Sequence, residues 1–206
     1  EVAFPAASQT DFDFVRYLIE GNHISDDVSI QVITQARPEL IARTMASLLG
    51  AKQAIVHVYN ATAPVFREQV FQMTREQVRN LAVAAVRQIK TWCLEHPETH
   101  WTLEYSPETF CMTELDFSTE VCQAVMAEWQ PSIEFPLILN LPATVEVNTP
   151  NVYADQIETM IDVLQLDAHT SISVHPHNDR GTGVAAAELA QLAGATRVEG
   201  CLFGNG

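Results

Sequence analysis

The chain has 206 residues, of which 47% are apolar and 18% are charged, which is enough apolar chain for one sizeable core and excludes a wholly disordered polymer. Its 11 basic and 26 acidic side chains give a net charge of -15 at pH 7. A surface of that charge repels phosphate backbones and anionic lipids, so we expect no nucleic-acid partner and no membrane partner.

Strand-like and helix-like segments alternate along the chain. Several strand-like runs are β-branched and apolar on both faces, as in a parallel sheet covered by helices; the runs are Val2–Phe4, Val28–Ile33, Ala54–Tyr59, Trp101–Tyr105, Ile133–Leu141, Ser171–Val174 and Arg197–Phe203. Amphipathic spacing predicts helices between them over Phe12–Ile19, Glu39–Leu49, Thr74–Glu95, Thr119–Trp129, Val152–Leu164 and Val184–Leu192. This alternation indicates βαβ units and a parallel sheet.

Two α/β architectures fit this alternation: an open doubly wound sheet and a (β/α)8 TIM barrel. No GxGxxG turn follows the first strand, which argues against the dinucleotide-binding version of the first. Polar residues follow the strands at Gln35, His57, Asn60, Ser106, Glu108, Asn140, Thr144, His175, His177 and Asn205. A barrel gathers such strand ends at one mouth, where its enzymes keep their active sites.

A barrel of this kind has roughly 250 residues, so 206 residues are about one β/α unit short. We therefore expect a single catalytic barrel domain, residues 1–206, that lacks the first β/α unit and the last helix. The chain begins at Glu1 as if part-way into a strand and ends abruptly at Gly206, so we expect a fragment of a longer parent chain.

The four cysteines contain no CxxC pair, and the start of the chain has no basic segment of a secretory signal. Both features predict reduced thiols in a cytoplasmic protein.

The most informative stretch for chemistry runs from Ile172 to Asn178. His175 and His177 are two residues apart on a predicted strand, so their imidazoles point to the same side, where they could hold one divalent ion. Asp179 could accept an imidazole N–H. The pair alone fits hydrogen-bonded structural histidines as well.

The continuation of that stretch favours the metal. From Ile172 to Ala185 the chain reads Ile-x-x-His-x-His-Asn-Asp-x-Gly-x-Gly-x-Ala, which resembles, at every defined position, the second signature of the alpha-isopropylmalate synthase/homocitrate synthase family. Further stretches resemble the isopropylmalate synthase branch of that family: residues 1–13, 57–62, 105–108, 140–146 and 198–206.

This resemblance implies a metal-dependent barrel and a Claisen-type condensation. Acetyl-CoA would add to 3-methyl-2-oxobutanoate to give 2-isopropylmalate and CoA, an acyltransferase reaction that commits carbon to leucine biosynthesis. His175 and His177 would ligate a divalent Zn, Mn or Mg ion. In the family the other two protein ligands and a polarising arginine lie in parts that this sequence does not contain, so the 206 residues alone are expected to be inactive.

The resemblance also implies roles for single residues. Glu108 would be catalytic, handling a proton or positioning acetyl-CoA, and Thr144 would bind the carboxylate of the 2-oxo acid. A pocket for the branched side chain would be lined by His57, Ser106, Asn140 and Pro142. Gly204 and Gly206 resemble the start of an acetyl-CoA loop.

Other interpretations stay open. Homocitrate and citramalate synthases would share the metal site, and a truncated barrel could bind metal poorly without catalysis. A metal hydrolase of the amidohydrolase type also carries an HxH pair, but there the pair ends the first strand, whereas here it ends the last-but-one strand. We expect only small-molecule substrates as partners, with a homodimer in the full-length parent.

Overall fold

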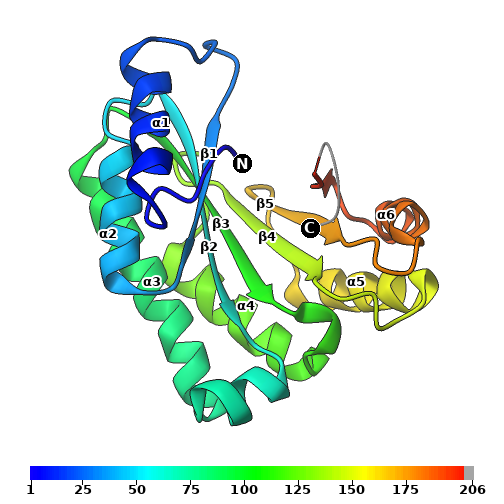
Figure 1. The fold of residues 1–206 in the computed structure, drawn as a ribbon. Coiled ribbons are helices and arrows are strands. Elements are labelled where there is room, and N and C mark those ends of the chain that lie inside the picture. The colour runs from blue at the N-terminus through cyan, green and yellow to red at the C-terminus, as the bar shows by residue number, and fades with distance from the viewer. Residues whose placement is uncertain (202–206) are drawn as a thin grey trace.

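The computed structural model describes residues 1–201 of the chain, which form one parallel α/β sheet with its helices (Figure 1). The strands are β1 (Ile30–Gln35), β2 (Gln53–Ala61), β3 (His100–Glu108), β4 (Leu137–Ala143), β5 (Thr170–Pro176) and β6 (Arg197–Val198). Each strand pairs with the next one in the chain, in the order β1-β2-β3-β4-β5-β6, and all pairs are parallel. A doubly wound sheet reverses its strand order at a switch point, so this unreversed order identifies the arc of a (β/α) barrel.

The helices lie on the outer side of that arc (Figure 1). They are α1 (Gln9–Glu20), α2 (Pro38–Ser47), α3 (Arg75–Glu95), α4 (Leu115–Trp129), α5 (Pro150–Leu164) and α6 (Gly183–Leu192). Their starts follow from local chemistry. Thr74 and Gln77 form a reciprocal capping box at α3, while Pro38 and Pro150 occupy the first turns of α2 and α5, where a missing N–H has no cost.

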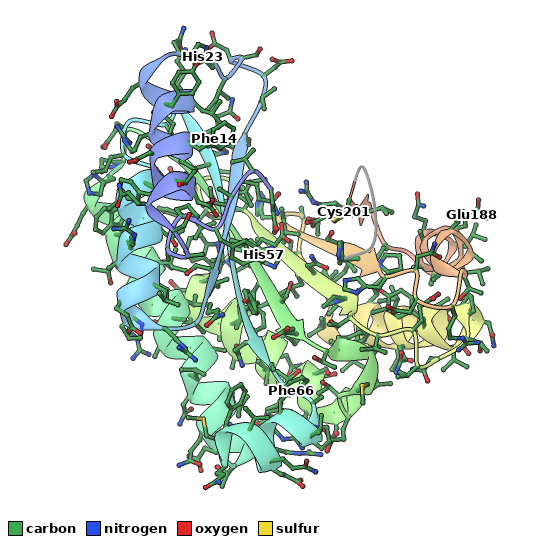
Figure 2. All side chains as sticks on the ribbon, viewed as in Figure 1. Phe14, His23, His57, Phe66, Glu188 and Cys201 are labelled. Carbon is green, nitrogen blue, oxygen red and sulfur yellow. The ribbon has the colours of Figure 1, made fainter. Side chains whose placement is uncertain are left out.

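The core fills the space between the sheet and the helices (Figure 2). Its largest fully buried side chains include Trp101, Trp129, Tyr105, Phe110 and Phe117. The predicted reduced thiols are confirmed for three cysteines, because Cys93, Cys111 and Cys122 are buried without a disulfide. Burial raises the pKa of Cys93 and of Cys122 to about 12, so these thiols behave as small apolar side chains.

Several predicted element boundaries differ from the structure. The expected first strand, Val2–Phe4, is an isolated bridge from Ala3 to Val32, since Pro5 has no N–H with which to extend a ladder. The fourth strand to pair in the sheet begins at Leu137 instead of Ile133, because Ile133 is 76% exposed in a turn that precedes Pro136.

At the C-terminal end, β6 contains two paired residues, and the last two positions of the predicted strand, 202 and 203, lie outside the described residues. Two short helices were not predicted: a π-helix over Phe66–Phe71 and a 3-10 helix over Phe110–Met112.

No helix among the described residues combines the length and the apolarity that crossing a membrane requires.

Candidate active site

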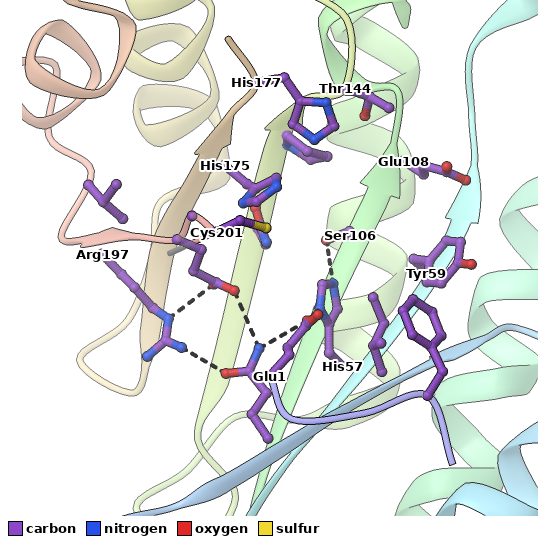
Figure 3. Close-up of a pocket in the computed structure, with 18 of the residues that line it drawn as sticks. Glu1, His57, Tyr59, Ser106, Glu108, Thr144, His175, His177, Arg197 and Cys201 are labelled. Carbon is purple, nitrogen blue, oxygen red and sulfur yellow. Dashed lines mark hydrogen bonds and ion pairs between the residues drawn. The ribbon is translucent and has the colours of Figure 1, made fainter. Parts of the chain in front are cut away.

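One cavity of about 1130 Å³ lies at the carboxyl ends of the strands (Figure 3). Eight of the predicted site residues line it: His57, Ser106, Glu108, Asn140, Pro142, Thr144, His175 and His177. They come from β2, β3, β4, β5 and the residues that follow β4 and β5. The structure therefore brings the predicted residues together, while their individual roles remain predictions. The other two, Gly204 and Gly206, lie outside the described residues.

The alternation of a β-strand explains this gathering. Side chains two residues apart on a strand point to the same face, so Ser106 and Glu108 of β3 both face the cavity, as His175 and His177 do at the end of β5. Because all strands are parallel, their carboxyl ends meet at the same edge.

The imidazoles of His175 and His177 lie next to each other at the end of β5 and line the cavity (Figure 3). Their ring centroids are 5.0 Å apart and the rings are nearly perpendicular, at 82°. Burial, followed by the neighbouring His177, lowers the pKa of His175 below its ordinary value, so His175 is neutral at pH 7 and keeps a lone pair for a metal ion. Neutral imidazole is the form that ligates divalent ions, so this pair fits a metal.

Backbone contacts fix Glu108 beside Thr144. The carbonyl of Glu108 accepts hydrogen bonds from the backbone N–H of Thr62 at 3.1 Å and from its hydroxyl at 3.2 Å. The chain then turns through Thr109, whose φ of 62° is left-handed and whose N–H donates to Thr144 Oγ1 at 3.1 Å. Thr144 thus accepts from the backbone and can donate its own proton to a ligand. Burial raises the pKa of the Glu108 carboxyl, which suits a group that exchanges a proton near neutral pH.

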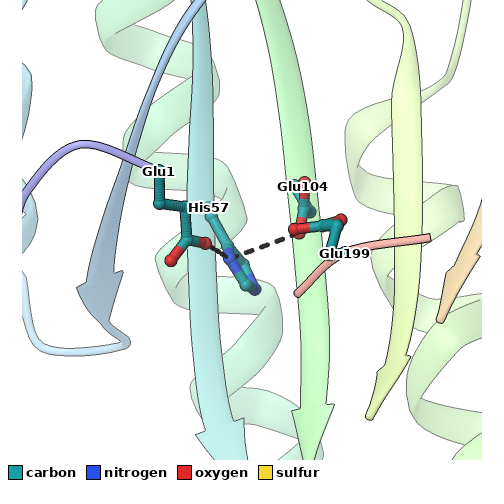
Figure 4. A group of neighbouring side chains, drawn as sticks. All are labelled: Glu1, His57, Glu104 and Glu199. Carbon is teal, nitrogen blue, oxygen red and sulfur yellow. Dashed lines mark hydrogen bonds and ion pairs between the residues drawn. The ribbon is translucent and has the colours of Figure 1, made fainter. Parts of the chain in front are cut away.

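His57 also lines the cavity, and the carboxylates of Glu1, Glu104 and Glu199 lie close to its ring (Figure 4). Its Nδ1 contacts Glu1 and lies 3.2 Å from Glu104 Oε1, and its Nε2 lies 2.7 Å from Ser106 Oγ. Burial alone lowers the pKa of His57, but the charges of Glu104 and Glu1 outweigh it and raise the pKa. The charged ring is therefore more stable here than in water, and Nε2 and the hydroxyl of Ser106 share a hydrogen bond.

Four side chains that sequence reasoning assigned no role surround this histidine. The amide nitrogen of Gln31 lies 3.2, 3.0 and 3.3 Å from carboxylate oxygens of Glu1, Glu104 and Glu199, and its two N–H groups can donate to two of them at a time. One signal was present in the sequence: Glu104 is a carboxylate inside an otherwise apolar strand and has the same parity as Ser106 and Glu108. Burial and the nearby Glu199 raise the pKa of Glu104 to about 7, although His57 opposes this shift.

These carboxylates and His57 are also the group among the described residues that could hold a metal ion. Ligand atoms of Glu1, His57, Glu104 and Glu199 lie within 4.8 Å of one another. Hydrogen bonds from Asn140, Ser173 and Arg197 already reach the carboxylates of Glu104 and Glu199. The structure therefore offers two sets of possible metal donors, this group and the imidazoles of His175 and His177.

Asp179 has a different partner from the predicted imidazole N–H. Its Oδ2 accepts the backbone N–H of Glu146 at 3.1 Å, which ties the residues after β5 to the residues after β4.

Comparison with known proteins identifies the family. The sequence profile described as HMGL-like matches residues 1–206. The chain belongs to the HMGL-like family. Among curated proteins, this HMGL-like chain is 68% identical to 2-isopropylmalate synthase of Marinomonas sp. (strain MWYL1), over 100% of the chain and 37% of that relative. It is 64% identical to 2-isopropylmalate synthase of Ralstonia pickettii (strain 12J), over 100% of the chain and 36% of the relative.

This HMGL-like chain spans little more than a third of the length of these relatives, at 37% and 36%. Solved structures share its fold at low identity. The carboxyl transferase domain of Rhizobium etli pyruvate carboxylase with pyruvate and biocytin has a TM-score of 0.58 at 12% identity, covering 94% of this chain and 30% of that chain. Rhizobium etli pyruvate carboxylase T882A with acetyl coenzyme-A has a TM-score of 0.60 at 11% identity, covering 93% and 17%. These likenesses support the barrel architecture.

Proposed function

We propose that this HMGL-like chain is the catalytic barrel of a 2-isopropylmalate synthase, an acyltransferase of leucine biosynthesis. The reaction is the condensation of acetyl-CoA with 3-methyl-2-oxobutanoate, followed by thioester hydrolysis. The observation that carries the proposal is that His175, His177, Glu108 and Thr144 line one cavity, in a chain whose relatives are named for this reaction. Residues 1–206 would form a single domain.

In this proposal a divalent ion is held by His175 and His177, and it would polarise the keto carbonyl of the 2-oxo acid. Zn, Mn and Mg all remain candidates.

The carboxylate end of the 2-oxo acid is assigned to Thr144. Its hydroxyl oxygen already accepts the N–H of Thr109, so its proton is available as a donor to a carboxylate. The branched end of the substrate is assigned to the part of the cavity lined by His57, Ser106, Asn140 and Pro142.

Proton transfer is assigned to Glu108. The condensation requires removal of a weakly acidic methyl proton from acetyl-CoA, and a positioned carboxylate contributes typically 10²–10⁴-fold to such a step. The raised pKa of Glu108 makes this carboxylate a stronger base than one in water.

The two alternative activities, homocitrate synthase and citramalate synthase, differ from this proposal in the 2-oxo acid that the pocket accepts, so an assay can distinguish them. The full polypeptide that carries this chain is incubated with acetyl-CoA, a divalent metal and one of several 2-oxo acids, and free CoA thiol is measured. We expect thiol release to be fastest with 3-methyl-2-oxobutanoate. Preference for 2-oxoglutarate or pyruvate would replace the proposal with a homocitrate or citramalate synthase.

Residues 1–206 by themselves are a matched sample in the same assay. We expect no thiol release from them, because the family draws further ligands from outside this sequence. Full activity of residues 1–206 alone would contradict the assignment of the metal site. A cytoplasmic location and a homodimer of the parent chain stay predictions.

A further inference from the structure

The segment after β5 begins with His177, one of the two metal-binding histidines of the proposed function, and it contacts a buried carboxylate. Glu146, three residues after β4, is only 6% exposed. Its carboxylate accepts hydrogen bonds from the backbone N–H of Arg180 and from the hydroxyl of Thr182. Neither partner belongs to its own loop, so the carboxylate joins the segment after β4 to the segment after β5.

The backbone of Glu146 strengthens the same junction. Its N–H donates to Asp179 Oδ2 at 3.1 Å, and its carbonyl accepts from the guanidinium of Arg180 at 3.3 Å. The same guanidinium also reaches the carbonyl of Asn148 at 3.3 Å. Charge-assisted bonds of this kind are stronger than bonds between neutral groups, so the junction is well fixed.

The hydroxyl of Thr182 belongs to this junction and does not cap α6. Thr182 is the residue before α6, where a threonine hydroxyl usually accepts a backbone N–H of the first turn. Here it makes no capping bond and donates to Glu146 instead. Asn178 supplies a replacement, since its Oδ1 accepts the N–H of Gly183 at 2.9 Å.

The turn between His177 and Gly183 connects this junction to His177. The N–H of His177 donates to the carbonyl of Ala143 at 3.2 Å. At the other end of the turn, Gly183 lies so close that a Cβ on it would be 2.8 Å from the carbonyl oxygen of His177. His177 is thus fixed between β4 on one side and the residues that Glu146 holds on the other.

We propose that Glu146 is a positioning residue: by binding Arg180 and Thr182 it holds the imidazole of His177 in the orientation that ligates the metal ion. The inference rests on the proposed function, because it needs His175 and His177 to be the ligands. Groups that hydrogen-bond directly to a metal ligand typically change metal affinity by 10–100-fold when they are removed. Glu146 reaches His177 only through the backbone, so we expect an effect at the lower end of this range.

The test uses the full polypeptide that carries this chain and three variants. Glu146→Gln keeps the shape but presents an amide donor toward the donors of Arg180 and Thr182, and Thr182→Val removes only the hydroxyl. Glu158→Gln is the matched control, because Glu158 is exposed on α5. Zn²⁺ affinity is measured by calorimetric titration of the metal-free protein, and the visible spectrum is recorded with Co²⁺ bound.

We expect Glu146→Gln to bind Zn²⁺ about 10-fold more weakly and to shift the Co²⁺ spectrum. Thr182→Val should change both less, and Glu158→Gln should change neither. A residue that acts only on overall stability would lower the unfolding midpoint without moving the Co²⁺ spectrum. If Glu146→Gln does not fold, the inference is tested on Thr182→Val. An unchanged Zn²⁺ affinity and an unchanged Co²⁺ spectrum in Thr182→Val would then overturn it.

A parallel titration of His177→Ala tests the proposed metal site separately from the positioning role of Glu146. If His177→Ala loses Zn²⁺ while Glu146→Gln retains normal affinity and spectrum, the positioning role is wrong and the proposed metal site stands. If His177→Ala retains Zn²⁺, the metal site itself is wrong.

Discussion

The Nε2 atom of His57 lies 2.7 Å from the hydroxyl oxygen of Ser106, across the neighbouring strands β2 and β3. On its other side the ring contacts Glu1 and faces Glu104 at 3.2 Å. The two carboxylates therefore favour a proton on Nδ1. In the imidazolium the Nε2–H donates to Ser106, which keeps its own proton for a cavity ligand, whereas in the neutral ring Ser106 donates to Nε2, so the buried acids influence the direction of this hydrogen bond.

The burial of Glu104 predicts a stability that falls as pH rises. The pKa of Glu104 is about 7 in the fold against an ordinary value of 4.5, so its contribution is fully present below pH 4.5 and is lost as pH rises through 7. His57, whose pKa is raised above 6.5, acts in the same direction. We expect the free energy of unfolding, measured in urea, to fall between pH 5 and 8, and Glu104→Gln to flatten this slope.

The exposed Glu134 supplies the control for that experiment. Glu134→Gln should leave the slope of the parent protein unchanged. Parallel curves for Glu104→Gln and the parent protein would show that Glu104 does not titrate in this range.

Removing one imidazole should abolish metal binding with little effect on the fold. His177 lies beyond the end of β5 and is half-buried at the cavity rim, so it adds little to the core. We expect His177→Ala to lose divalent metal in a calorimetric titration and to lose thiol release, while its circular dichroism spectrum is unchanged. His169→Ala, at an exposed histidine before β5, should bind metal normally; equal losses in both variants would contradict a specific ligand role.

Glu108 should affect turnover and leave metal binding intact. Glu108→Gln keeps the side-chain shape but cannot accept a proton, so we expect thiol release to fall about 10²–10⁴-fold with an unchanged Zn²⁺ titration. Glu95→Gln, at an exposed position near the end of α3, is the control. A loss of turnover below tenfold would move the proton transfer to another residue.

Because the guanidinium of Arg67 is buried, we expect its ion pair with Glu114 to contribute more to the free energy of unfolding than a similar ion pair on the surface does. Arg67 is 4% exposed and binds Glu114 through two bonds of 2.8 Å, which hold the pKa of Glu114 at about 2. Glu114→Gln leaves this buried charge without its anionic partner and also removes the ion pair of Glu114 with Arg75 at 3.0 Å. We expect a loss of about 1–3 kcal/mol in urea unfolding at pH 7, toward the lower end because the Glu114 side chain is 36% exposed and solvent screens its ion pairs.

The matched pair is Arg87 with Glu128, which is also bidentate but whose arginine side chain is 65% exposed. Glu128→Gln should cost less than about 1 kcal/mol, since solvent screens a surface pair. Equal losses at the two sites would show that burial of Arg67 does not govern the cost.

Local patterns were sufficient for the fold class and for which residues share a face. Period-two alternation places Ser106 beside Glu108 and His175 beside His177, and the parallel order brings these strand ends to one edge. The core of α3 also follows from its spacing and capping box. These features depend on neighbours within a few residues, which the sequence specifies directly.

Contacts between distant segments depended on the tertiary structure. Gln31 reaches Glu104 and Glu199, which are 73 and 168 residues away, and Glu146 binds Thr182 across 36 residues. No periodicity encodes such pairs, because they arise only when the sheet curves and brings β1, β3 and the residues after β6 around one space. The sequence by itself therefore determined a parallel barrel-type sheet with polar strand ends, whereas the curvature of the packed sheet decided the charge of His57 and the anchoring of His177.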